Sequence, residues 1–145
     1  ATTGRDDSSP THQWTTATAA RWTVAGCANV LLYSTPTTEA NPNRWQDDYA
    51  WSFDRVPATA ACTFHIYIPA SPYAAYTAAY DWTPGTPNYL EGDAFTIDQA
   101  THRGTWYEKG PFTFNTGKAM LMITDARTGA PNATLTAAAT RLTCA

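Results

Sequence analysis

The side chains able to carry acid–base or nucleophilic chemistry are few in this sequence and lie far apart. They are three histidines and three cysteines: His12, His65, His102, Cys27, Cys62 and Cys144. Catalysis by such groups requires a nucleophile, a base and an orienting partner within hydrogen-bond reach of one another. The sequence holds no Gly-x-Ser-x-Gly, His-Glu-x-x-His or phosphate-loop motif that would place such groups together. We therefore predict a protein that is not an enzyme.

The individual positions favour ordinary roles for the histidines and acids. His65 alternates with Phe64 and Ile66, so it faces away from them, and we interpret it as a plain surface histidine. His102 follows Asp98 in a predicted loop. One predicted loop, 34–48, carries Glu39, Asp47 and Asp48, which leaves a structural calcium ion as an alternative. Their spacing is irregular, so we predict no metal site and no cofactor.

Composition excludes several classes of protein. The 145 residues suit one domain, and charged residues make up only 14% of the chain, with a formal net charge of −3. Lysine and arginine do not cluster, so nucleic acid is not an expected partner. No apolar run is long enough for a membrane helix. The opening residues 1–4 suit a mature end left after signal cleavage, which favours a secreted, extracellular protein.

The odd number of cysteines fits export with one disulfide and one remaining thiol. The remaining thiol has two interpretations: a buried, inert side chain, or a cysteine that bonds to another chain.

The apolar pattern predicts an all-β fold. The clearest strand is 62–68, in which alternate residues from Cys62 to Ile68 share one apolar face. Further strands are predicted within 30–33, 49–53, 76–82, 95–97, 106–107, 112–114, 119–124 and 134–144, with a turn at 109–111. Many short strands separated by turns are typical of a two-sheet antiparallel β-sandwich of jelly-roll type. Residues 1–13 hold no large apolar side chain, so we predict a flexible polar arm followed by a single β-sandwich domain over 14–145.

Six pieces of the second half resemble a known family. They are 61–69 (ACTFHIYIP), 76–80 (YTAAY), 95–99 (FTIDQ), 103–106 (RGTW), 110–114 (GPFTF) and 137–144 (AAATRLTC). In this order and spacing they resemble the golvesin/xanthan lyase carbohydrate-binding-like domain, over about residues 59–145. Ala138 and Thr140 stand where that family often has Asp and Val. The resemblance implies a sandwich fold and a non-catalytic, accessory role.

The resemblance also implies the disulfide. The strands that carry Cys62 and Cys144 belong to one core in similar domains, so we pair these two cysteines. Cys27 is then the free or intermolecular thiol.

Two recognition functions fit these features. A polar arm, a spare thiol and aromatic loops favour a protein-docking adaptor within a secreted bacterial assembly, such as a toxin complex. The alternative is a carbohydrate-binding module that stacks an extracellular polysaccharide on exposed rings. The ligand-contacting aromatics predicted for it are Trp45, Tyr73 and Tyr89. Trp106 matches a tryptophan of structural character in the similar family.

Overall fold

The fold is known from a computed structural model, which describes residues 2–6, 15–16, 32–34, 48–84, 94–114, 116–124 and 134–145. Every regular element in these ranges is a β-strand. The strands are β1 (Thr2–Asp6), β2 (Thr15–Thr16), β3 (Leu32–Ser34), β4 (Asp48–Asp54), β5 (Ala61–Ile68), β6 (Thr77–Thr83), β7 (Phe95–Asp98), β8 (Thr105–Thr113), β9 (Lys118–Thr124), β10 (Leu135–Ala137) and β11 (Thr140–Cys144). The prediction of an all-β fold is confirmed.

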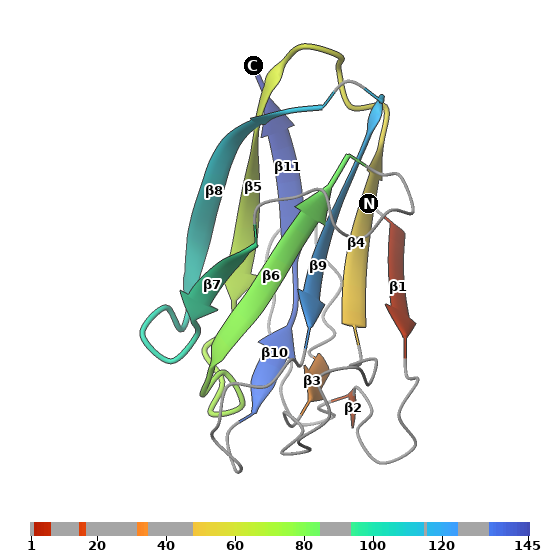
Figure 1. Cartoon of the computed structure of the whole chain (residues 1–145). Helices are drawn as coiled ribbons and strands as arrows, with labels where there is room; N and C mark the ends of the chain where they lie inside the picture. Colours follow the sequence, from red (N-terminus) through yellow and green to blue (C-terminus); the bar gives the residue numbers. More distant parts are fainter. Residues whose placement is uncertain are drawn as a thin grey trace.

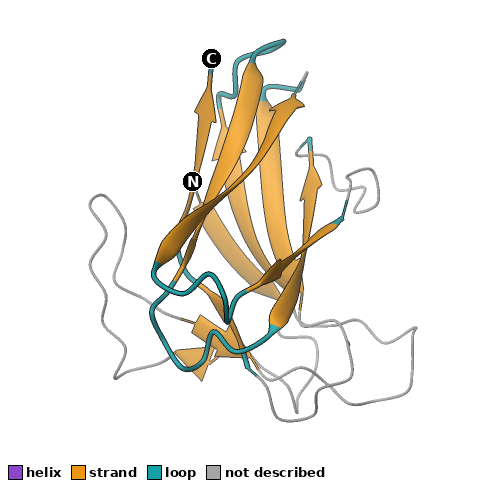
Figure 2. Cartoon of the chain, turned by 90° about the vertical axis from the view of Figure 1, so that its left-hand side faces the viewer, coloured by secondary structure: helices purple, strands orange, loops and turns teal. Residues whose placement is uncertain are grey.

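Two antiparallel sheets form the layers of a β-sandwich. The larger sheet has the strand order β1-β4-β9-β6-β7, and the smaller has the order β11-β5-β8. In Figure 1 the larger sheet stands in front of the smaller one, and Figure 2 shows the two layers from the side. A third, short sheet, β10-β3-β2, lies at the lower end in Figure 1.

The core follows from the alternation along the strands. In β5 the inward residues Cys62, Phe64, Ile66 and Ile68 are at most 1% exposed. Leu121 and Ile123 of β9, in the other layer, belong to the same core and are fully buried. Burying each such side chain contributes about 1.5–3 kcal/mol. The face of β5 that was predicted to point inward therefore lines the core.

Aromatic rings join the two layers near one end of the sandwich. Trp82 of β6 packs on Phe112 of β8, with ring centroids 4.4 Å apart. Phe64 of β5 lies 5.9 Å from Phe53 of β4 and 5.8 Å from Phe114. Edge-to-face and tilted ring pairs of this kind add about 0.5–1.5 kcal/mol each beyond area burial.

One buried polar side chain links the larger sheet to the short third sheet. Gln99, which follows β7, is fully buried. Its Nε2 donates to the Tyr80 hydroxyl at 2.9 Å and to the Thr136 carbonyl at 2.8 Å. Its Oε1 accepts from the backbone N–H and the hydroxyl of Thr136. Both ends of the amide are thus satisfied, as burial of a polar group requires.

The disulfide predicted between Cys62 and Cys144 is present. These residues lie directly opposite each other in β5 and β11. Ala61 and Ala145, next in the ladder, exchange both backbone hydrogen bonds. Cys62 and Cys144 therefore occupy the non-hydrogen-bonded type of pair, in which opposing side chains approach most closely.

Two predicted boundaries are wrong. The expected turn at 109–111 lies inside β8, because the ladder with β5 shifts register between Cys62 and Phe64, and Gly110 and Pro111 form a bulge there. The expected final strand 134–144 is two strands in different sheets, β10 and β11. The chain changes sheet at 138–139, where the Ala138 carbonyl accepts from Trp51 Nε1 at 3.3 Å.

The structure describes only one segment of the predicted amino-terminal arm. Thr2–Asp6 pairs with β4 as the edge strand β1. The rest of 1–13 lies outside the described residues, so the division at 13/14 stays a prediction. In the described ranges no helix has the length and apolar character needed to cross a bilayer.

Candidate functional site: the outer face of the three-stranded sheet

Six side chains from three strands share the outward side of the β11-β5-β8 sheet. We call this set the outer face; it consists of His65, Tyr67, Trp106, Glu108, Arg141 and Thr143. β5 is the central strand, and its outward residues alternate with the apolar core residues. The ladder places Arg141 and Glu108 on either side of His65 in one cross-strand row. Trp106 lies beside Tyr67 in the next row.

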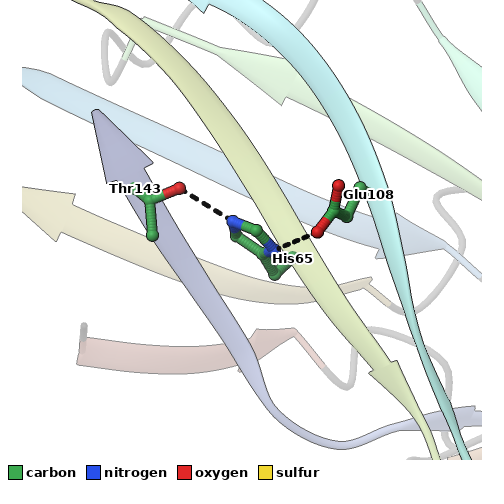
Figure 3. A network of polar contacts seen from close by, with 3 residues as sticks. All are labelled: His65, Glu108 and Thr143. Atoms are coloured by element: carbon green, nitrogen blue, oxygen red, sulfur yellow. Dashed lines mark hydrogen bonds and ion pairs between the residues drawn. The ribbon is translucent and has the colours of Figure 1, made fainter. Parts of the chain in front are cut away.

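His65 connects all three strands of the sheet. Its Nε2 lies 2.7 Å from the Thr143 hydroxyl oxygen of β11, and its Nδ1 lies 3.1 Å from Glu108 Oε1 of β8 (Figure 3). A carboxylate facing Nδ1 favours the tautomer with the proton on Nδ1. Nε2 then accepts a hydrogen bond from the Thr143 hydroxyl. The His65 side chain is only 11% exposed, so the expectation of a plain surface histidine is wrong.

The order hydroxyl, imidazole, carboxylate is that of a catalytic triad. In a triad the carboxylate is buried and hydrogen-bonded to the imidazole, which fixes the orientation of the ring. The Glu108 side chain is instead 67% exposed, and its contact with Nδ1 has the distance of an ion pair without the geometry of a hydrogen bond. The arrangement therefore supports a cross-strand link better than an activated nucleophile.

An aromatic pair and an arginine form the second part of the outer face. The rings of Tyr67 and Trp106 are 5.3 Å apart and inclined by 52°. The Arg141 guanidinium lies over the Trp106 ring, with Cζ 5.1 Å from the centroid. A guanidinium carries five N–H donors, so contact with one ring leaves donors available for other groups. Arg141 itself is exposed, so these donors face solvent.

A separate exposed aromatic stands on a fixed loop. Tyr73 is 37% exposed, and among the described residues it is the one large hydrophobic side chain of that exposure. Arg103 Nε donates to the Ala74 carbonyl at 2.7 Å, and the Thr134 hydroxyl donates to the Tyr73 carbonyl at 2.7 Å. Two segments distant in sequence thus hold the loop that presents Tyr73.

The structure describes one of the three aromatics predicted from the sequence, Tyr73. Trp45, Tyr89 and Cys27 lie outside the described residues. Trp106, expected to be structural, is half-buried on the outer face with a cation over its ring. Arg141 was not predicted, although its place as the one charge in a strand of threonines and apolar residues was a visible signal.

Comparison with protein-family models, curated proteins and solved structures found no significant match for this chain. The class that the structure defines is an all-β, disulfide-bonded two-sheet sandwich. In the described ranges no group of three or more His, Cys, Asp or Glu side chains is arranged to hold a metal ion.

Proposed function

We propose that this chain is a non-catalytic recognition module that docks a protein partner through the outer face. The observation that carries the proposal is the meeting of Tyr67, Trp106 and Arg141 on one exposed sheet surface. Tryptophan, tyrosine and arginine are the residues that most often dominate the energy of protein–protein interfaces. Their side chains are already ordered by mutual contact, which reduces the entropy lost on binding.

The same contacts favour a protein over a sugar at this face. A pyranose ring binds tryptophan by lying flat on the indole. Here the Arg141 guanidinium occupies one side of the Trp106 ring. A sugar on that side would have to displace the cation, whereas a protein carboxylate can bind the guanidinium where it stands.

Carbohydrate binding is the second candidate, and Tyr73 is the observation that favours it. Its ring is exposed on a loop fixed by Arg103 and Thr134, as a stacking platform requires. The resemblance to golvesin-like domains, which is itself a prediction, supports an accessory role of either kind.

A secreted location is part of the proposal. The Cys62–Cys144 disulfide is compatible with an oxidising, extracellular compartment, where such bonds persist. We place the module in a secreted bacterial assembly, such as a toxin complex, with other secreted subunits as its partners. Cys27 would add a covalent contact, and the part of the predicted arm that follows β1, residues 7–13, an extended one.

Capture from culture supernatant tests the docking function. Immobilised wild-type chain is compared with Trp106→Ala and Tyr73→Ala, under non-reducing and reducing conditions. We expect a specific protein partner whose recovery falls with Trp106→Ala and is unchanged with Tyr73→Ala. Retention on insoluble polysaccharide that is lost with Tyr73→Ala would favour the sugar-binding alternative instead. Substrate turnover that disappears with His65→Gln would contradict a non-catalytic role.

A further inference from the structure

We infer that the free edge of β11 docks an extended segment of a partner protein, which joins the three-stranded sheet as an additional strand. We call this surface the β11 edge; it consists of the main-chain groups of Thr140, Leu142 and Cys144, which face away from β5. The β11 edge is a different surface from the outer face, so the inference goes beyond the proposed function. The two share the premise that the partner is a protein.

The hydrogen bonds of β11 show which of its main-chain groups lack a neighbour. Ala61 and Ala145 exchange both backbone hydrogen bonds, and the Ala139 carbonyl accepts from the Tyr67 N–H at 2.9 Å. The odd-numbered residues of β11 therefore bond to β5. In an antiparallel ladder the residues between them direct their N–H and C=O groups to the other side. Within the described ranges no main-chain hydrogen bond uses these groups of the β11 edge.

Only an extended polypeptide matches this row of donors and acceptors. A β-strand repeats its N–H and C=O groups at the spacing of β11, so a strand laid along the edge can pair with all of them. A second polar group at the edge also lacks a partner, since the Thr140 hydroxyl oxygen is buried without a hydrogen bond. Unsatisfied main-chain and side-chain groups thus occur together at one end of the sheet.

The inward side chains beside the edge are incompletely covered. Leu142 and Cys144 pack against the core but are only partly buried. Phe53 of β4 is also partly buried, and its ring lies 5.9 Å from Phe64, the cross-strand neighbour of Leu142. The larger sheet continues beyond β4 to β1, whereas the smaller sheet ends at β11 (Figure 1). A further strand with apolar side chains at every second position would extend the core on this side.

The opposite edge of the same sheet carries protection that the β11 edge lacks. β8 contains the bulge at Gly110 and Pro111, and proline has no N–H to donate. Lys109 of β8 places its ammonium group over the Phe95 ring of the other sheet, 5.1 Å from the centroid. Bulges, prolines and lysines at an edge hinder the addition of strands. β11 has no proline and a continuous ladder with β5, and its charged residue, Arg141, lies on the outer face.

Hydrogen exchange measured by NMR tests the inference with a defined probe. The probe is the peptide acetyl-Lys-Thr-Val-Thr-Val-Thr-Val-Lys-amide, in which apolar side chains alternate. A peptide of the same composition with its three valines consecutive is the control. With about 2 mM probe and a Kd of about 0.5 mM, we expect the N–H groups of Thr140, Leu142 and Cys144 to exchange about fivefold more slowly. The control peptide should leave these rates unchanged.

A proline at the edge supplies the matched variant. Thr140→Pro removes one N–H of the β11 edge and places a ring where the added strand would lie, while the bonds of β11 to β5 remain. Thr96→Pro is the control on β7, the edge strand of the other sheet. The Gln99 N–H bonds to Tyr76 of β6, so by alternation the Thr96 N–H faces away from β6. We expect Thr140→Pro to weaken probe binding at least about tenfold and Thr96→Pro to bind as wild type does.

Three results would overturn the inference. They are unchanged exchange of the three N–H groups with the probe, equal probe binding by Thr140→Pro and Thr96→Pro, and strong protection of the three N–H groups in the chain alone, which would show that the edge is already filled. The exchange measurement uses wild type and does not depend on the folding of a variant. Circular dichroism and a thiol count establish that each variant keeps its fold and disulfide.

The supernatant capture separates this inference from the proposed function. Capture that depends on Trp106, in a chain that does not bind the probe, overturns only strand addition at the β11 edge. Probe binding in a chain whose capture does not depend on Trp106 overturns docking through the outer face and leaves the β11 edge as the docking site.

Discussion

The Gln99 side chain makes the two hydrogen bonds with Thr136 that a neighbouring strand would make. Its Nε2 donates to the Thr136 carbonyl, and its Oε1 accepts from the Thr136 backbone N–H. The two distances are both 2.8 Å, and the groups are completely enclosed. A side chain thereby supplies the hydrogen bonds that β10 lacks on this side. The same amide holds the Tyr80 hydroxyl, whose burial raises the pKa of the phenol far above its usual value and keeps it neutral.

Replacing this amide should be costly. Gln99→Leu would leave the Thr136 backbone groups and the Tyr80 hydroxyl buried without partners. At about 1–3 kcal/mol for each unsatisfied group, we expect a loss of about 2–5 kcal/mol in the free energy of unfolding, measured by urea denaturation. Tyr80→Phe removes one partner and should cost about 1 kcal/mol. Thr96→Ala, at an exposed position of β7, is the control; equal effects of all three variants would contradict the role assigned to Gln99.

The disulfide should account for a large share of the stability. It closes a separation of 82 residues, for which the chain-entropy model gives about 4–5 kcal/mol. The double variant Cys62→Ala, Cys144→Ala is expected to unfold at correspondingly lower urea concentration, and reductant should have little further effect on it. Cys27→Ser should keep the bond and the wild-type response to reductant. Loss of the bond in Cys27→Ser would show that the pairing is different.

Gly110 should resist substitution more strongly than Gly117. A Cβ on Gly110, at φ +149°, would lie 2.8 Å from the Cys62 carbonyl oxygen and 3.1 Å from Thr63 Cα. Both contacts are backbone atoms of β5, which cannot move aside without distorting the bulge. We expect Gly110→Ala to cost about 2–4 kcal/mol.

Gly117 is the matched control for Gly110, because its φ is also positive but an added Cβ would meet no neighbouring atom. Gly117 has φ +74°, and nothing lies within 4 Å of the Cβ that would be added. Gly117→Ala should therefore cost only about 1–2 kcal/mol, from backbone conformation alone. Thermal or urea unfolding of both variants gives the comparison, and a smaller cost at Gly110 than at Gly117 would contradict the close approach.

Asp81 should make stability depend on pH. Desolvation raises the pKa of this carboxyl above its ordinary 3.8, and the hydrogen bond that it accepts from the Trp82 N–H only partly opposes the shift. A carboxyl whose pKa is higher in the folded state favours folding when protonated. That contribution is complete below the unfolded pKa and is lost as the pH rises through the folded pKa.

The direction in which stability changes with pH gives a direct test. Asp81→Asn keeps an acceptor for the Trp82 N–H but carries no charge, so it should stabilise the protein near pH 7 and give no gain below about pH 4. Urea unfolding of wild type and variant from about pH 3 to about pH 8 measures the difference. Asp81→Ala removes the acceptor as well and should gain less. A gain for Asp81→Asn that grows toward acid pH would contradict the assignment.

The strands that the sequence predicted well are those with strict alternation. Phe64 and Ile66 in β5, and Leu121 and Ile123 in β9, lie inward as their spacing indicates, because period-two patterns report one buried face. The bulge in β8 was not predictable, since Lys109-Gly110-Pro111 has the composition of a turn. The pairing with β5 on both sides of these residues, and the close approach of Gly110 to the β5 backbone, show that the strand continues.

The sequence predicted which side of β5 carries the outer-face residues His65 and Tyr67, but not which residues of other strands surround them. Alternation placed His65 and Tyr67 opposite the core residues, and that is where they lie. It could not show that Thr143, Glu108 and Arg141, from two other strands, would surround His65. Contacts of this kind depend on strand order and register, which a single sequence does not contain.

The bond between Cys62 and Cys144 has a consequence for the outer face as well as for the core. Side chains alternate along a strand, so a shift of β11 by one residue against β5 would exchange its two sides. Arg141 and Thr143 would then point into the apolar interior, and Leu142 would point to solvent. A covalent link at the end of this pair excludes the slipped alignment, so the charges on the surface owe their position to a sulfur–sulfur bond on the opposite side of the sheet.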